Sequence, residues 1–165
     1  MTERPKLTLP LSPTDKIIEI AGWVCLALLW ITTLVCYANL PEIIPTHFNL
    51  AGKADDHGHK MVIYFLPVIG TLMFIGMTVL NRYPHRFNYP ATITADNAAR
   101  QYQNGKRMVR VLKLGIAIVF SMLVFMIYRS ATGPSGNLQY WFLPVMLAVI
   151  LIPLAYFTIR AVKLK

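Results

Sequence analysis

Four apolar runs, each about long enough to cross a bilayer, dominate this sequence. They cover residues 17–40, 61–80, 109–128 and 138–159. A helix needs about 20 mainly apolar residues to span the hydrocarbon core of a bilayer, and a helix satisfies its own backbone hydrogen bonds there. The sequence therefore predicts one all-α integral membrane domain over residues 1–165, with four transmembrane helices.

The composition supports a membrane protein and argues against a nucleic-acid-binding protein. Apolar residues make up 56% of the chain and charged residues 14%, whereas soluble domains average roughly 45–50% and about 25%. The formal net charge is +9, but the basic residues flank the apolar runs and no nucleic-acid-binding module is recognised. We therefore expect the lipid bilayer to be the partner, and no nucleic acid.

The positions of the basic residues predict the orientation. Of the 16 Lys and Arg residues, 13 lie before residue 17, within 81–113 or after residue 159, and the other three are Lys53, Lys60 and Arg129. Cytoplasmic segments carry the excess of Lys and Arg in membrane proteins. We expect both termini and residues 81–113 in the cytoplasm, with loop 41–60 outside.

The cytoplasmic segment 81–113 combines an extended start with an amphipathic helix. Pro84 and Pro90 favour extended backbone, and from Ala95 the apolar residues recur at helical spacing. This pattern predicts a basic helix near the membrane surface, between the second and third spans and running into the third. The residues expected to contact anionic lipid headgroups are Arg100, Lys106, Arg107, Arg110 and Lys113.

The apolar runs carry little chemistry. Trp23, Trp30 and Tyr37 are seven residues apart and share one helical face, which favours helix packing or interfacial anchoring over stacking of a ligand. No Asp, Glu, Lys, Arg or His lies in the middle of a run. Ion-coupled transporters usually bury such groups near the midplane, so a small transporter component is a minor alternative.

Loop 41–60 holds the densest set of polar side chains. Imidazole and carboxylate are ligands of zinc and similar divalent metals, which makes a metal-binding protein or metalloenzyme an alternative. The spacing completes no standard metal motif, and a polar, partly helical loop with solvated histidines is the preferred explanation. No catalytic constellation is evident, so a non-enzymatic protein is the main expectation. The candidate metal ligands are His47, Asp55, Asp56, His57 and His59.

The same loop carries a spaced motif, PxxIPxHFNxxGxxDxxGxK, over Pro41 to Lys60. It resembles the domain of unknown function found in the bacterial SdpI-type immunity protein family. The resemblance implies a multi-pass protein of the bacterial cytoplasmic (inner) membrane, in toxin-peptide immunity or membrane signalling. It implies a secreted peptide outside or a regulatory protein inside as a partner. The loop residues expected to bind a ligand are His47, Asn49, Gly52, Asp55 and Lys60.

Overall fold

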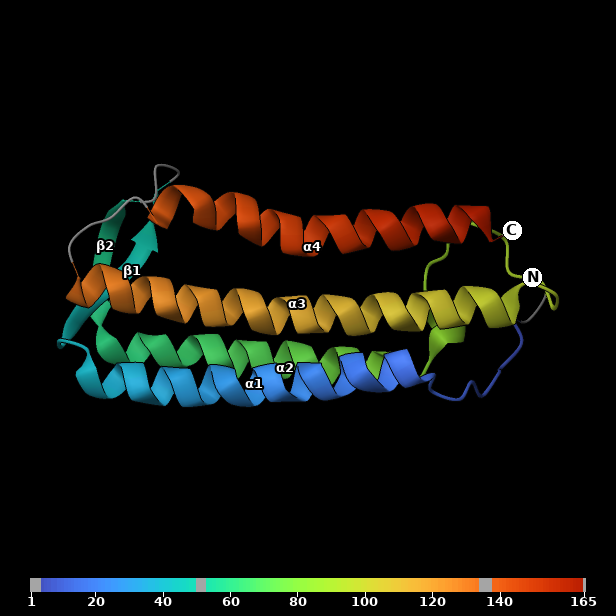
Figure 1. Cartoon of the computed structure of the whole chain (residues 1–165), viewed down its shortest axis with the longest axis horizontal. Coiled ribbons are helices and arrows are strands. Elements are labelled where there is room, and N and C mark those ends of the chain that lie inside the picture. The colour runs from blue at the N-terminus through green and yellow to red at the C-terminus, as the bar shows by residue number, and fades with distance from the viewer. Residues whose placement is uncertain (1–3, 50–52, 134–137, 165) are drawn as a thin grey trace.

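Four long helices lie side by side along the long axis of the molecule (Figure 1). The structure is a computed structural model that describes residues 4–49, 53–133 and 138–164. Four helical segments of the described residues, Pro13–Asn39, Lys60–Leu80, Ala98–Thr132 and Trp141–Lys163, are long and apolar enough to cross a membrane, which confirms the predicted fold class. The helices are α1 (Pro13–Asn39), α2 (Phe65–Leu80), α3 (Ala98–Thr132) and α4 (Leu138–Lys163), with short 3-10 helices η1 (Lys60–Tyr64) and η2 (Pro84–Arg86).

A two-stranded antiparallel sheet caps one end of the helices, which we call the hairpin end. It consists of β1 (Ile43–Phe48) and β2 (Ala54–His59). The expected partly helical loop is therefore a β-hairpin instead. Both marked chain ends lie at the opposite end of the molecule (Figure 1), which we call the basic end.

The N-terminus of α1 is fixed by local sequence. Pro13 occupies the first turn, where its missing N–H costs nothing. The Ser12 hydroxyl accepts a hydrogen bond from the Asp15 backbone N–H at 3.1 Å, and the Asp15 carboxylate accepts one from the Ser12 backbone N–H at 3.3 Å. This capping box satisfies two backbone donors that the helix itself leaves free.

The three evenly spaced aromatic residues of α1 pack along α2 and its preceding turn. The Trp23 ring meets Phe74 edge to face, with centroids 4.9 Å apart. Trp30 Nε1 donates to the Thr71 hydroxyl at 3.0 Å. Farther along, Tyr37 contacts the ring of Tyr64 with centroids 4.8 Å apart. The predicted helix-packing role of this face is confirmed.

The core joins the helices to the hairpin. Leu29, Phe74 and Val124 come from three different helices and are fully buried. Ile44 of β1 and Ile63 of η1 belong to the same apolar cluster, and each is 1% exposed. Because one cluster holds both the helices and the hairpin, the hairpin has a defined position on the bundle.

Helix α3 corrects the prediction of a surface helix. Its 35 residues form one continuous helix, about 52 Å long at 1.5 Å per residue, against about 30 Å of hydrocarbon. The basic segment therefore continues the axis of the third span and packs inside the basic end (Figure 1). Within the protein, partners are found for the side chains of Gln101, Asn104, Arg107, Arg110 and Lys113 in this segment.

Helix α4 packs against α3 and is attached at two levels. A Cβ atom added to Gly115 would lie 3.1 Å from the Val149 side chain and 3.4 Å from the Val149 carbonyl oxygen. Pro153 has no N–H to bond that carbonyl, four residues earlier. Near the basic end, the Gln101 and Asn104 amides donate to carbonyls of the last turns of α4 at 2.8–3.2 Å.

Candidate functional site

The pairing register of the hairpin explains why a proline is tolerated within strand β1. The Lys60 backbone N–H donates to the Glu42 carbonyl at 2.9 Å, and Pro45 lies opposite His57. Bonded and non-bonded pairs alternate in antiparallel strands, which places Pro45 and His57 in a non-bonded pair. Proline therefore costs the ladder no hydrogen bond, and the His57 backbone N–H faces away from β1.

Polar contacts within the hairpin involve most of the predicted ligand-binding residues. His47 Nδ1 lies 2.5 Å from Asp55 Oδ1, and both side chains are exposed. The Asn49 side chain accepts a hydrogen bond from the Lys53 backbone N–H at 3.1 Å, and the Asn49 N–H donates to the Lys53 carbonyl at 2.9 Å. Asn49 thus closes the turn between the strands. Gly52 lies outside the described residues.

Glu42 links the base of the hairpin to α1. Its carboxylate lies 3.0 Å from Lys60 Nζ and 3.1 Å from His59 Nε2. Lys60 Nζ also lies 5.1 Å from the centroid of the Tyr37 ring, a favourable cation–π position. The hydrogen bond and positive charge of Lys60 lower the pKa of Glu42. Lys60 therefore has a structural role at this junction.

The predicted metal ligands are divided among separate contacts. His47 pairs with Asp55, whereas His59 pairs with Glu42. The Asp56 carboxylate accepts a hydrogen bond from the His57 N–H at 2.8 Å. Within residues 4–49, 53–133 and 138–164, no group of three or more His, Cys, Asp or Glu residues could hold a metal ion. Among these residues, the hairpin thus brings at most two candidate metal ligands together in one place.

Three of the five predicted lipid-contacting residues form internal ion pairs instead. Arg107 donates to Asp15 at 2.8 and 3.1 Å and to the Ser12 hydroxyl at 3.0 Å. Arg110 Nε lies 3.3 Å from the Glu19 carboxylate. Only 7% of the Arg110 side chain is exposed, too little for a headgroup contact.

Lys113 is the most buried member of this ion-pair cluster. Its Nζ donates to Glu19 at 2.5 Å and to the Thr78 hydroxyl at 2.9 Å, and it lies 4.3 Å from the Phe74 ring centroid. Its side chain is fully buried. Burial in contacts with α1 argues against a lipid contact for Arg110 and Lys113. Arg107 is paired with Asp15 but 23% exposed, so its lipid contact stays a prediction.

The other two basic residues differ from these three. Arg100 is exposed, whereas Lys106 is half-buried and donates to the Leu9 carbonyl at 3.5 Å.

Sequence reasoning missed Asp15 and Glu19, the acidic partners of the ion-pair cluster. The available signal was their i, i+4 spacing on α1, which places two carboxylates on one face.

The comparisons with known proteins identify one domain within the chain. Residues 24–71 match the Domain of unknown function (DUF1648). The matched range includes most of α1, the hairpin and the start of α2. The chain is also similar to an uncharacterized protein of Archaeoglobus fulgidus, at 28% identity over 162 residues, covering 90% of this chain and 87% of that protein. No solved structure matches.

Proposed function

We propose that this protein is a non-enzymatic protein of the bacterial inner membrane that recognises an extended peptide outside the cell through its hairpin. From the distribution of Lys and Arg in the sequence, we expect both termini in the cytoplasm. The role would be immunity to a toxic peptide or membrane signalling. The observation that supports the proposal is that strand β2 pairs with another strand on one side alone among the described residues.

Strand β2 has a strand neighbour on one side alone among the described residues. Four of its six residues are exposed. The backbone groups of His57 face away from β1. Its N–H donates to the Asp56 carboxylate of the same strand at 2.8 Å, a local bond that an added peptide strand would have to replace. An unpaired strand edge is a template on which an extended peptide adds as a further strand.

Contacts with the bundle also hold the hairpin in a defined position. Ile44 anchors β1 in the core, and Glu42 fixes the hairpin base through Lys60 and His59. A template already in its binding conformation loses less conformational entropy when a peptide adds to it. The ligand contacts would then be backbone groups of β2, with the exposed side chains of Asp56 and His57 beside them.

The test is survival of a sensitive bacterial host challenged with a panel of secreted toxic peptides. His57→Pro removes an edge N–H without removing a ladder bond, and Arg100→Gln is a control at the basic end. We expect the wild-type protein and Arg100→Gln to protect against at least one peptide, and His57→Pro to lose that protection at equal expression. Unchanged sensitivity across the panel with the wild-type protein contradicts the immunity role.

A binding measurement tests recognition apart from immunity. Purified wild-type and His57→Pro proteins in detergent would be titrated with the same peptides, and binding measured by calorimetry. We expect a peptide that binds the wild-type protein to show no binding to His57→Pro. Equal affinity for the two proteins would exclude the β2 edge as the binding surface.

A further inference from the structure

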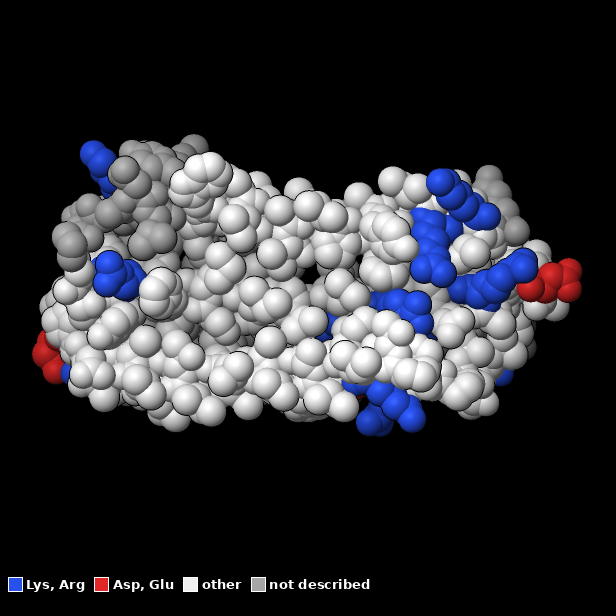
Figure 2. All heavy atoms as spheres, viewed as in Figure 1, with Lys and Arg blue, Asp and Glu red and all other residues white. Residues whose placement is uncertain are grey.

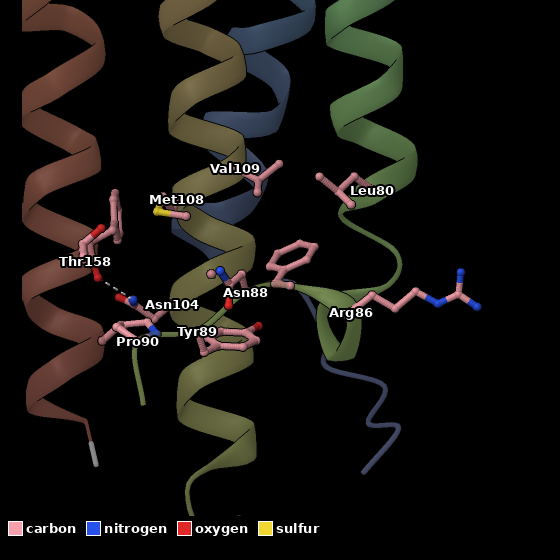
Figure 3. A pocket seen from close by; sticks show the side chains of 13 residues that line it. Leu80, Arg86, Asn88, Tyr89, Pro90, Asn104, Met108, Val109 and Thr158 are labelled. Atoms are coloured by element: carbon pink, nitrogen blue, oxygen red, sulfur yellow. Dashed lines mark hydrogen bonds between the residues drawn. The ribbon is translucent and has the colours of Figure 1, made fainter. Parts of the chain in front are cut away.

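A cavity of about 340 Å³ lies at the basic end, between α3, α4 and residues 86–90 (Figure 3). Pockets that hold small ligands are typically about 300–1,000 Å³ in volume and mainly apolar, with a few polar groups. The lining of this cavity is mainly aromatic and aliphatic, so its shape and surface suit a small apolar ligand. The apolar lining residues are led by Leu80, Phe87, Met108, Val109, Phe157 and Ala161.

The cavity wall that lies outside the helices is held in place by packing and hydrogen bonds. A Cβ atom on Gly105 would lie 3.1 Å from both the Phe87 ring and the Tyr89 hydroxyl, so glycine permits their close packing. Tyr89 donates to the Pro84 carbonyl at 2.9 Å, and Arg4 Nη1 donates to the Phe87 carbonyl at 2.7 Å. Burial raises the pKa of Tyr89. The phenol therefore stays uncharged, and the wall is in position before a ligand enters.

The positive charge of the basic end lies outside the cavity. Lys and Arg side chains gather over the ends of α3 and α4 (Figure 2), but among the described residues Arg86 is the one charged residue that lines the cavity. Its side chain extends away from the other lining side chains (Figure 3), and its guanidinium carbon lies 5.3 Å from the centroid of the Tyr83 ring. A charged ligand would lose its hydration in the cavity without gaining an opposite charge. The cavity therefore selects an uncharged ligand.

Asn104 brings to the cavity lining a hydrogen-bond acceptor that has no partner. Its amide nitrogen donates to the Phe157 carbonyl at 2.9 Å, across the contact between α3 and α4. Its Oδ1 atom is buried and has no hydrogen-bond partner among the described residues. The amide oxygens of Asn81 and Gln101 are also buried without a partner there, but Asn104 alone of the three residues lines the cavity. Because a buried acceptor left unpaired is costly, a ligand that brings a donor to Asn104 Oδ1 gains affinity.

We propose that this cavity binds a lipophilic alcohol, an uncharged and mainly apolar molecule whose hydroxyl donates a hydrogen bond to Asn104 Oδ1. The apolar body of the ligand would lie against Phe87, Met108 and Phe157. A ketone or an ester fits less well, because its carbonyl oxygen only accepts hydrogen bonds. An alkyl amine fits less well because it is protonated near neutral pH and would bring a charge into the cavity. The cavity and the hairpin lie at opposite ends of the molecule (Figure 1), so this site does not depend on peptide recognition by the hairpin.

The test is equilibrium dialysis of the full-length protein in lipid nanodiscs, with empty nanodiscs of the same lipid correcting for partition into the bilayer. We expect saturable binding of one 2-naphthol and no saturable binding of the anion 2-naphthoate. Met108→Trp, which fills the cavity, should weaken 2-naphthol binding at least tenfold. Thr158→Trp, at an exposed lining position on α4, gives a second steric block. Thermal unfolding in the same nanodiscs verifies that both variants are folded.

Two matched asparagine variants test the hydrogen bond itself. Asn104 and Asn81 are both buried, and each donates through Nδ2 to a backbone carbonyl and leaves Oδ1 without a partner among the described residues. The probes are 2-naphthol and 2-methylnaphthalene, in which a methyl group replaces the hydroxyl. The ratio of their affinities should fall about fivefold from wild type to Asn104→Leu, as expected for one hydrogen bond, and change less than twofold in Asn81→Leu. Binding of 2-methylnaphthalene to Asn104→Leu shows that its cavity is intact.

Two competitors distinguish the possible sources of the alcohol. Displacement of 2-naphthol by dioleoylglycerol in the nanodisc would support a membrane lipid as the ligand, whereas displacement by 1-decanol alone would support a smaller alcohol. Displacement by neither competitor would overturn the proposal. So would 2-naphthoate binding as tight as that of 2-naphthol, 2-naphthol binding that survives both tryptophan variants, an affinity ratio unchanged in Asn104→Leu, or an equal fall of that ratio in both asparagine variants.

Discussion

Removing the negative charge of Glu19 should destabilise the protein strongly, because Glu19 is the carboxylate nearest to the buried Lys113 amine. In Glu19→Gln, the Lys113 ammonium keeps the Thr78 hydroxyl and the Phe74 ring, but no carboxylate at its present distance of 2.5 Å. Leaving one member of a buried ion pair unpaired costs about 3–5 kcal/mol. We expect a loss of that size in the free energy of unfolding.

The converse change should cost less. In Lys113→Met, Glu19 keeps Arg110 at 3.3 Å, and its side chain is 23% exposed, so water also solvates it. We expect a loss of about 1–3 kcal/mol. The double variant lacks both the Lys113 ammonium and its carboxylate partner, while Arg110 keeps Asp15 at 3.8 Å. It should therefore be less destabilised than the sum of the single variants by about 1–3 kcal/mol.

The assay is reversible unfolding in mixed micelles, followed by circular dichroism as the fraction of sodium dodecyl sulfate rises. Asp96→Asn makes the same chemical change as Glu19→Gln at an exposed position and should stay within about 0.5 kcal/mol of wild type. The reasoning is refuted if Glu19→Gln costs less than about 1 kcal/mol. Additivity of the single variants within about 0.5 kcal/mol would also refute it.

Three further predictions concern the hairpin and α4. Asp55→Asn breaks an exposed contact with His47, so it should cost less than about 1 kcal/mol while accelerating amide hydrogen exchange in the hairpin; unchanged exchange there would contradict this. Lys60 lowers the pKa of Glu42. The Glu42 contacts therefore stabilise the hairpin above the usual glutamate pKa of about 4.3, and this stabilisation is lost as the pH falls through the lowered pKa. Protection of the hairpin amides from hydrogen exchange should fall over that range, and protection that does not change with pH would contradict this. Gly115→Leu adds a side chain where Val149 already packs closely, so it should lower the free energy of unfolding by about 1–3 kcal/mol. Leu147→Ala changes an exposed residue of the same helix as Val149 and serves as the control with a small expected effect. An unchanged free energy of unfolding in Gly115→Leu would contradict close packing of α3 against α4.

The four spans could be predicted because the bilayer imposes length and apolarity on each segment separately. The packing face of Trp23, Trp30 and Tyr37 was predictable for a similar reason, since spacing within one helix determines it. The hairpin was harder to predict. Its strands are short, and its polar residues suit a turn, a loop or an edge strand equally.

The ion-pair cluster could not be predicted from helical periodicity. A basic face on α3 has the same spacing whether it meets lipid headgroups or carboxylates of another helix. Arg107 and Asp15 are 92 residues apart in the chain, yet their atoms lie 2.8 Å apart. Local patterns carry no information on that pairing. The cavity was equally hidden, because Arg4, Gly105 and Tyr89 meet only in the folded chain.

The most direct test of the account is the side of the membrane on which the hairpin lies. His57→Cys and Arg100→Cys would be made separately in a chain whose Cys25 and Cys36 are replaced by alanine. Intact cells would then be treated with a membrane-impermeant maleimide. The account predicts labelling of His57→Cys in intact cells, and of Arg100→Cys only after permeabilisation. Labelling in the opposite pattern would place the hairpin in the cytoplasm and contradict recognition of an external ligand.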